Sequence, residues 1–425
     1  MNMRPRATSG AHDGFAASDK LYKRAVRVDA RAFSRDDILV ASHRRTVYPR
    51  YVDRLEGAYV WDVDQHRYLD YNLGYGPVVL GHADQRVNAA VVEALTMGNC
   101  LAPYWSPHQV DLCETLVRLT PGSDMAYLLK TGSDATSAAV RLARIATGRD
   151  LIVRWGYNGW HDWACPETPG IPAAVRDLTL GYEYGDIVSL EDRFRMHPRE
   201  IAAVVMMPFG YERPTPGHLA DVQALCRENG ALLVLDEMRS GFRMRAGGIA
   251  ADLGVEPDLT TYSKAMANGY PISAVVGRAG VMEGFARTRI SSTFFAGPAE
   301  MVAALTTIAV LEETDALARI YAAGRRLQEG LSSLVERHGL AAEVVGYPSM
   351  PFMRFTDPDP VARASASEAF YVATTKGGVL LHPAHQWFVS AAHTTDDVEQ
   401  TLDVVANAIT TAVAAVPGLV AGRSI

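Results

Sequence analysis

The sequence has few cysteines and no long hydrophobic run. Its 425 residues include four cysteines, and no two of them form a C-x-x-C pair. This spacing argues against a disulfide framework and the common zinc-ligand patterns, and it suits a reducing cytosol. Apolar runs such as residues 231–235 have the length of strands rather than membrane spans. The first residues lack the apolar stretch of a secretory signal peptide, so we expect a cytoplasmic protein without membrane contact.

An excess of basic residues is also missing. Lys and Arg number 41 against 48 Asp and Glu, which gives a net charge of −7. A mildly acidic chain without a basic stripe argues against nucleic acid as the main partner. Apolar residues make up 48% and charged residues 21% of the chain, as in ordinary soluble enzymes. Composition excludes these classes, and the motifs must indicate the activity.

Short apolar runs alternate with helical segments in the middle of the chain. We expect strands at residues 125–130, 151–154, 202–207, 231–237, 258–262 and 272–277. Apolar strands separated by helices predict a mostly parallel sheet covered on both faces, which is an α/β fold. A smaller α+β part is expected near the C-terminus, with strands at residues 343–345, 352–355, 378–381 and 388–390. Residues 1–18 are expected to form a loose arm, followed by a helix over residues 19–31.

A candidate phosphate site follows the first of these strands. Thr131, Gly132 and Ser133 lead from the strand directly into a helix. Free backbone N–H groups and the positive end of the helix dipole favour an anion at such a turn, and the Ser133 hydroxyl adds a donor. The same residues also fit a plain helix N-cap. The chain has no Walker lysine and no G-x-G-x-x-G loop, so nucleotide binding by those loops is not expected.

Two later strands end in charged residues. Asp236 and Glu237 close an apolar run, and Lys264 follows another expected strand. Ligands of parallel sheets bind at the carboxyl ends of strands, where a buried carboxylate needs a partner such as a protonated ring nitrogen. A desolvated lysine has a lowered pKa and can form a Schiff base. Taken singly, Asp236 also fits a loop acid paired with Arg243, and Lys264 a solvated surface charge.

The three signals together match the needs of one cofactor. A phosphate cradle, a lysine for a Schiff base and an acid for a pyridinium nitrogen are what pyridoxal 5′-phosphate requires. The lysine would bond to the cofactor and later move a proton, and the aspartate would keep the ring nitrogen protonated. The helix N-terminus would neutralise the phosphate.

The chain resembles the class III aminotransferases of the fold-type I pyridoxal-phosphate enzymes, most closely the glutamate-1-semialdehyde aminomutase branch. The resemblance runs from about Leu21 to the last helix. It rests on the segments GAYVWDVDQHRYLDY (57–71), GYGPVVLGHAD (74–84), KTGSDATSAAVRLAR (130–144), LDEMRSGFR (235–243), PDLTTYSKAMANGYP (257–271) and SSTFFAGP (291–298).

The resemblance implies roles for single residues. Lys264 matches the Schiff-base lysine of the family, and Asp236 matches its pyridinium aspartate. Gly132 and Ser133 match the phosphate turn. Tyr157 matches the aromatic residue that stacks on one face of the ring.

The resemblance also implies a partner and an architecture. Met238 takes the place of the apolar residue that covers the other face of the ring. Thr293 matches a threonine that reaches the phosphate of the neighbouring subunit, so the active sites would be shared in a homodimer. The expected domains are an arm with part of a small domain (1–75), a large seven-stranded cofactor domain (76–303) and a C-terminal small domain (304–425).

The chain departs from the family where the substrate would bind. Tyr75 replaces a tryptophan, and His385 stands about where the aminomutases carry an acidic residue. Asn158 replaces the histidine next to the stacking tyrosine, which should leave stacking intact. Arg239 stands where the family often has Gln or Met; it could bind the phenolic oxygen of the cofactor or a substrate carboxylate, or it could pair with Glu237. These changes argue against true glutamate-1-semialdehyde aminomutase activity.

No metal site is expected from the histidines near the C-terminus. His382, His385 and His393 are scattered over a region of strand and turn, where hydrogen-bonded pocket residues are more common than ligands.

The sequence therefore predicts a pyridoxal-phosphate-dependent aminotransferase. It would move an amino group between an amino acid or amine and a keto acid or aldehyde. An aminomutase, or an amino-acid racemase or epimerase, would use the same residues and is the alternative enzyme. A non-catalytic scaffold would not require the lysine, the aspartate and the phosphate turn together.

Overall fold

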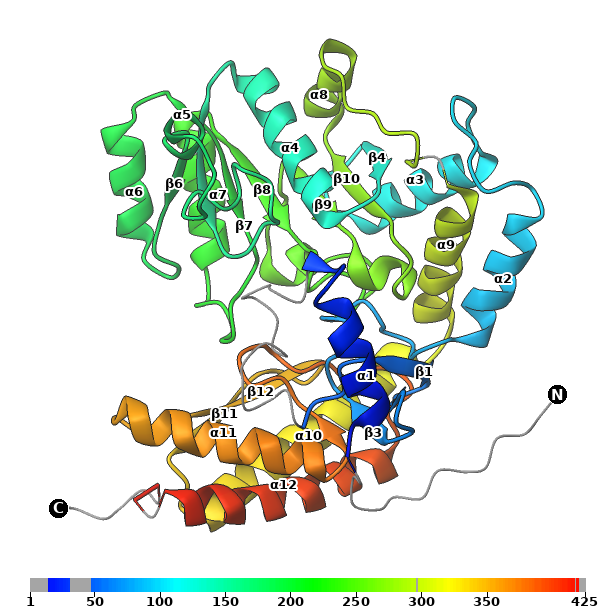
Figure 1. Cartoon of the computed structure of the whole chain (residues 1–425). Helices are drawn as coiled ribbons and strands as arrows, with labels where there is room; N and C mark the ends of the chain where they lie inside the picture. Colours follow the sequence, from blue (N-terminus) through cyan, green and yellow to red (C-terminus); the bar gives the residue numbers. More distant parts are fainter. Residues whose placement is uncertain (1–13, 31–46, 296, 417, 420–425) are drawn as a thin grey trace. The chain divides into compact units, whose positions relative to one another are not determined.

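The chain folds into two compact units (Figure 1). The computed structural model describes residues 14–30, 47–295, 297–416 and 418–419. The sheet unit contains residues 76–79 and 85–317, and the terminal unit contains the described residues among 1–75, 80–84 and 318–425. The domain ranges expected from the sequence stay a prediction. Residues 1–13 of the expected arm, and residue 31 of the expected helix, lie outside the described residues.

The sheet unit is built on a seven-stranded sheet in the order β4-β10-β9-β8-β7-β5-β6. Six strands run parallel, and β10 pairs antiparallel with both of its neighbours. The mostly parallel α/β fold expected from the sequence is thereby confirmed. The strands are β4 (Met125–Leu129), β5 (Leu151–Trp155), β6 (Thr179–Gly181), β7 (Ile201–Met206), β8 (Leu232–Asp236), β9 (Leu259–Tyr262) and β10 (Ser273–Gly277).

Helices cover both faces of this sheet. Val205 and Val234 belong to a core cluster with the apolar residues of α4, whereas their chain neighbours Val204 and Leu233 pack in a second cluster. Successive strand residues point to opposite faces, so the two clusters lie on opposite sides of the sheet. The second cluster contains residues of α6 and α7. The helices of this unit are α2 (Gln85–Leu95), α3 (Pro107–Leu119), α4 (Gly132–Thr147), α5 (Ala173–Arg176), α6 (Ile187–Met196), α7 (His218–Asn229), η3 (Ala250–Leu253), η4 (Lys264–Ala267), α8 (Ala279–Met282), η5 (Glu283–Arg287) and α9 (Pro298–Glu313).

Glycines end two of these helices where the sequence predicts it. Gly148 follows α4 with φ of 67°, and Gly230 follows α7 with φ of 64°. These left-handed conformations carry little cost without a Cβ, which is why glycine is common after a helix.

The terminal unit contains two small sheets and four helices among the described residues. One sheet has the order β1-β2-β3-β13, in which β13 pairs parallel with β3, and the other is the antiparallel pair β11-β12. The strands are β1 (Val52–Glu56), β2 (Tyr59–Asp62), β3 (Arg67–Asp70), β11 (Ala342–Tyr347), β12 (Met350–Phe355) and β13 (Val379–Leu380). The helices are α1 (Ala16–Ala25), α10 (Ala316–Arg337), α11 (Pro360–Lys376) and α12 (Thr395–Ala415).

The strand expected at residues 388–390 is wrong. The N–H of Phe388 donates to the carbonyl of Tyr71, and the N–H of Val389 donates to that of Ser349. Neighbouring residues of this segment therefore bind two different parts of the unit. The segment is extended without forming a ladder with either part.

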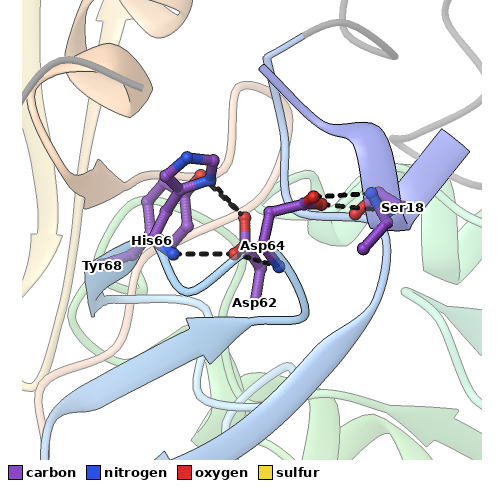
Figure 2. A network of polar contacts seen from close by, with 6 residues as sticks. Ser18, Asp62, Asp64, His66 and Tyr68 are labelled. Carbon is purple, nitrogen blue, oxygen red and sulfur yellow. Dashed lines mark hydrogen bonds and ion pairs between the residues drawn. The ribbon is translucent and has the colours of Figure 1, made fainter. Parts of the chain in front are cut away.

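A polar network ties α1 to the turn between β2 and β3 (Figure 2). The Asp64 carboxylate accepts hydrogen bonds from the N–H groups of Ala17 (2.7 Å) and Ser18 (3.0 Å) at the start of α1. The N-cap residue Phe15 has no side-chain acceptor for these groups. Asp62, which is buried, holds the same turn by accepting from the backbone N–H groups of Asp64 and His66. A carboxylate at the first turn satisfies the free donors of the helix and favours its dipole.

No helix within the described ranges is both long and apolar enough to cross a membrane.

Candidate active site

The turn between β4 and α4 exposes unpaired N–H groups. Thr131 is the N-cap: its hydroxyl accepts from the N–H of Asp134 (3.2 Å), and the Asp134 carboxylate accepts from the N–H of Thr131 (2.8 Å). Across the described part of the chain, no acceptor binds the N–H of Gly132 or Ser133. Because Thr131 supplies the cap, the turn retains two donors at the positive end of a 16-residue helix. This arrangement favours a bound anion.

Two glycines at this turn lie in close contact with neighbouring residues. A Cβ added to Gly132 would lie 3.1 Å from Sδ of Met238. Gly159 has φ of 114°, and a Cβ there would lie 2.5 Å from Oγ of Ser133. Ser133 Oγ accepts a hydrogen bond from the N–H of Trp160 (3.2 Å). The segment around Gly159 therefore packs directly onto the first turn of α4.

Asp236 places a buried carboxylate at the end of β8. Asp236 is 1% exposed, and burial raises the pKa of its carboxyl group. Oδ2 accepts from Nδ2 of Asn158 (2.8 Å), and Oδ1 accepts from the N–H of Met238 (3.1 Å). Among the described residues, no cation forms an ion pair with this carboxylate. The pairing with Arg243 that the sequence left open is therefore absent.

Lys264 begins η4 directly after β9 in a strained conformation. Its φ is 48°, in the left-handed region that costs a lysine about 1 kcal/mol or more. Burial, and after it the positive charge of Arg239, lowers the pKa of Lys264 to about 8. A lysine amine is an effective nucleophile and base only in its neutral form, and this shift brings the appearance of that form down to about pH 8.

Arg239 is held by backbone carbonyls. One terminal nitrogen, Nη2, donates to the carbonyl oxygens of Phe209 and of Gly210 (2.9 Å), and the guanidinium lies 5.1 Å from the centre of the Phe209 ring. Burial lowers the pKa of Arg239 to about 10. The pairing with Glu237 that the sequence left open is absent. The Glu237 carboxylate accepts instead from Ser240 and from backbone N–H groups.

Two other residues implied by the resemblance lie at the surface of the sheet unit. Tyr157 is 69% exposed. Thr293 is exposed as well, and its carbonyl accepts a weak hydrogen bond from Sγ of Cys100 (3.5 Å). Within the described ranges no hydrogen bond or ion pair joins Thr293 to the turn at Gly132, and the roles of Tyr157 and Thr293 stay predictions.

Tyr75 and His385 lie together in the terminal unit. Their rings meet edge to face at 5.4 Å, and His382 approaches both rings at 5.5 and 5.7 Å. Tyr75 has φ of 65°, a left-handed conformation that is uncommon for an aromatic residue. Sequence reasoning assigned no role to His382, although its spacing of three residues from His385 is a visible signal. No group of three or more metal-binding side chains occurs in the described ranges.

Sequence reasoning also missed the contact between Asn158 and Asp236. The sequence shows that Asn158 replaces the family's histidine, but it relates this change only to the stacking of Tyr157. The available signal for this contact was the small polar side chain of Asn158 next to Tyr157.

The residues of the sheet unit fit pyridoxal phosphate. The turn at Gly132 and Ser133 offers N–H donors to a phosphate, and the carboxylate of Asp236 lacks the cation that a protonated ring nitrogen would supply. Lys264 offers an amine with a lowered pKa.

Comparison with known proteins agrees with this fit. The family model described as aminotransferase class III matches residues 40–163 and 173–412. The chain is 38% identical to the aminopentol aminotransferase of Sphingopyxis macrogoltabida, over 84% of this chain and 85% of that protein. It is 36% identical to the glutamate-1-semialdehyde 2,1-aminomutase of Hyperthermus butylicus, over 84% and 90% of the two chains.

A solved structure extends the comparison to the whole fold. The FumI protein of Sphingopyxis sp. MTA144, in its form with pyridoxal phosphate as the internal aldimine, superposes with a TM-score of 0.88 at 34% identity. The superposition covers 95% of this chain and 98% of that one. The expected family, cofactor and activity are thereby confirmed: the chain belongs to the class III aminotransferases, which transfer amino groups with pyridoxal 5′-phosphate.

Proposed function

We propose that Lys264 and Asp236 are the catalytic residues of this aminotransferase and that Gly132 and Ser133 bind the cofactor phosphate. The observation that carries the proposal is the buried carboxylate of Asp236, which forms no ion pair with any described residue. When bound, the cofactor supplies a protonated ring that accepts electrons from the substrate carbon that loses a proton. Tyr157 and Met238 would cover the two faces of that ring.

Lys264 moves the proton in this proposal. Its Nζ is neutral in about half of the molecules at pH 8, so it can accept a proton from the amino-bearing carbon of the substrate. The same nitrogen would then return that proton on the cofactor side of the amino nitrogen, and hydrolysis by water would release the carbonyl product and leave the amino group on the cofactor. Asp236, held by the N–H donors of Asn158 and Met238, would supply the negative charge that keeps the ring nitrogen protonated.

The pKa of Lys264 can be tested in the protein without cofactor. Labelling of Lys264 by an amine-specific reagent is expected to reach half of its maximal rate near pH 8, against about 10.4 for an ordinary lysine. A charged, buried amine destabilises the fold, so the free energy of unfolding of the apoprotein should rise between about pH 8 and pH 10.5. Mass spectrometry of the labelled peptides gives both rates in one sample, with the exposed Lys376 as control. Equal profiles for the two lysines would contradict the prediction.

Substrate recognition involves Arg239, Tyr75 and His385 in our proposal. Nη2 of Arg239 is occupied by the carbonyls of Phe209 and Gly210, but Nη1 makes no hydrogen bond with any described residue. A cation fixed in this way can bind a carboxylate through its remaining nitrogen without reorganising. The edge-to-face rings of Tyr75 and His385 supply a mixed aromatic and polar surface in the terminal unit.

Replacing Arg239 by glutamine tests this role. We expect kcat/KM for carboxylate-bearing amino donors to fall about 10- to 100-fold, while that for simple amines changes less than about 3-fold. Arg149 is a matched control, because its Nη1 also donates to two backbone carbonyls, those of Ile201 (3.0 Å) and Asn229 (2.9 Å). Arg149→Gln should lower the activity towards both substrate classes equally. An equal loss for both classes in Arg239→Gln would argue against a carboxylate clamp.

Net transfer of the amino group can be tested with one substrate at a time. Relatives include an aminopentol aminotransferase and a glutamate-1-semialdehyde aminomutase, so amine donors as well as amino acids belong in the screen. A transaminase mixed with an amino donor alone should release one equivalent of carbonyl product per active site. An aminomutase or racemase would release none, and a racemase would instead exchange the α-proton of its substrate in heavy water.

We further propose that the functional unit is a homodimer with shared active sites. Tyr104, Trp105 and Phe294 expose large aromatic side chains on the sheet unit, and Trp105 is 81% exposed. Next to them lies a cavity of about 190 Å³, lined by residues 102–105 and by Ser291, Ser292 and Phe295 among others. Exposed aromatic side chains of this kind are typical of a surface that another protein covers. Thr293 lies in the same segment, from which it would reach the partner's phosphate.

Placing a charged residue on this aromatic surface tests whether the protein forms the proposed homodimer. We expect Trp105→Glu to yield a monomer whose activity is at least about 10-fold below that of the wild type, because Thr293 no longer completes the partner's site. Light scattering after size exclusion measures the mass. Val188→Glu is the control, since it places the same charge at an exposed apolar residue on α6 of the same unit. An active Trp105→Glu monomer would contradict shared sites.

A cytoplasmic location completes the proposal. All four cysteines are free thiols in the structure, which a reducing compartment favours. Cell fractionation would test it.

A further inference from the structure

Asn158 makes a buried hydrogen bond to the carboxylate of Asp236. The residue is 2% exposed, and its Nδ2 lies 2.8 Å from Oδ2 of Asp236. The orientation of the amide follows from chemistry, because an ionised carboxylate accepts hydrogen bonds and only the NH₂ group of an amide can donate one. The other amide atom, Oδ1, is buried and accepts no hydrogen bond from any described residue. An unsatisfied buried acceptor destabilises the fold, so the position of this side chain points to its donor contact with Asp236.

The backbone of Asn158 is fixed to the helix that carries the phosphate turn. Its carbonyl accepts a hydrogen bond from Oγ1 of Thr136 on α4 (2.7 Å). Two residues on, the N–H of Trp160 donates to Oγ of Ser133. Between them, Gly159 adopts φ of 114° and leaves no room for a Cβ beside Ser133. Asn158 therefore joins the end of β8, which carries the acid, to the first turns of α4.

We propose that Asn158 is a positioning residue, which fixes the Asp236 carboxylate for the cofactor nitrogen through a donor that does not titrate. This inference rests on the proposed pairing of Asp236 with the protonated ring nitrogen. With Oδ2 held by Asn158 and Oδ1 held by the N–H of Met238, the carboxylate cannot rotate without losing a hydrogen bond. The family's histidine at this position would instead carry a charge that depends on pH.

Three charged residues act on the Asp236 carboxylate or lie next to it in the chain. Lys264 from η4 and Arg239 from the turn after β8 act on the carboxylate as positive charges, and Glu237 lies next in the chain. Near pH 6.5 neither an arginine nor an amide changes its charge, and Lys264 titrates near pH 8. Burial raises the pKa of Glu237 to about 7, so this carboxyl group titrates near that range in the wild type as well. A histidine introduced at residue 158 would thus add a second titration to that of Glu237.

The test measures cofactor affinity and the pH dependence of the cofactor spectrum in three variants. Asn158→Ala should raise the Kd of the apoprotein for pyridoxal phosphate about 10- to 100-fold, since a donor to a buried charge is lost. Asn158→Asp should raise it more than 100-fold at pH 8, since a second carboxylate then faces Asp236. Asn158→His should bind within about 5-fold of the wild type at pH 8, but between about pH 6 and 7 its absorbance should change by more than that of the wild type, in which Glu237 titrates near this range.

Two reference variants separate the outcomes. Asn229→Asp makes the same exchange at a partly buried amide that donates to the carbonyl of Leu225, and it should leave Kd unchanged. Asp236→Asn tests the underlying pairing: if it leaves Kd unchanged, the proposed role of Asp236 fails. If Asp236→Asn weakens binding but Asn158→Ala binds like the wild type, or if Asn158→His shows no new titration, the inference about Asn158 is overturned. Should Asn158→Ala not fold, Asn158→His decides through its titration alone.

Discussion

Replacing Lys264 by alanine is expected to lower kcat at least about 1000-fold. The variant loses the amine that we propose to bond to the cofactor and the group that moves the proton, and proton transfer alone contributes about 10²- to 10⁴-fold. The purified wild type should also absorb visible light through its bound cofactor, and Lys264→Ala should lose the band that depends on a covalent bond to the lysine. Borohydride treatment should fix the cofactor on the peptide that contains residue 264 only in the wild type.

Lysine variants elsewhere show whether this loss is specific. Lys376 is exposed at the end of α11, and Lys376→Ala should keep full activity and the same spectrum. Lys264→Ala should still bind pyridoxal phosphate without a covalent bond, because the turn at Gly132 and the carboxylate of Asp236 are retained. A colourless wild type in the presence of added cofactor, or an alanine variant with normal turnover, would contradict the assignment of Lys264.

Both catalytic candidates could be predicted because each lies at the end of a strand with a clear pattern. The run that ends at Asp236 is continuous and apolar, and the short segment that ends at Tyr262 is rich in β-branched and aromatic residues, so the sequence locates the sheet edge where the charged residues project. β6 was missed for the opposite reason. It has three residues, Thr179–Gly181, which are too few to show the alternation of apolar and polar residues that marks a strand.

The partners of these residues could not be predicted, because they depend on the order of strands. Asn158 follows β5 and lies 78 residues before Asp236, which ends β8. In the sheet, β7 lies between those two strands, and no pattern along the chain specifies that order. The carbonyls that hold Arg239 come from Phe209 and Gly210 after β7, again from a neighbouring strand. The sequence thus predicted which groups carry charge, but not which uncharged groups orient them.

Replacing Asp236 by asparagine is expected to have the second large effect. An amide cannot balance the charge of a protonated ring nitrogen, so we expect kcat to fall about 10²- to 10⁴-fold and the Kd for pyridoxal phosphate to rise at least 10-fold. The apoprotein should respond differently. Burial raises the pKa of Asp236 above its ordinary value, so the stability of the apoprotein falls as the pH rises from that ordinary value to the raised pKa, above which the buried charge is fully present.

Asparagine removes that buried charge but can satisfy only one of the two donors, Asn158 and Met238. These effects oppose each other, so the Tm of the apoprotein should change little, whereas the gain in Tm on adding cofactor should shrink. Glu237→Gln is the matched control. Burial raises the pKa of Glu237 to about 7, and its partners are Ser240 and the N–H groups of Ile249 and Ala250. That variant should shift the Tm of both forms equally and keep the cofactor Kd. If Asp236→Asn behaved in the same way, Asp236 would be a structural acid like its neighbour.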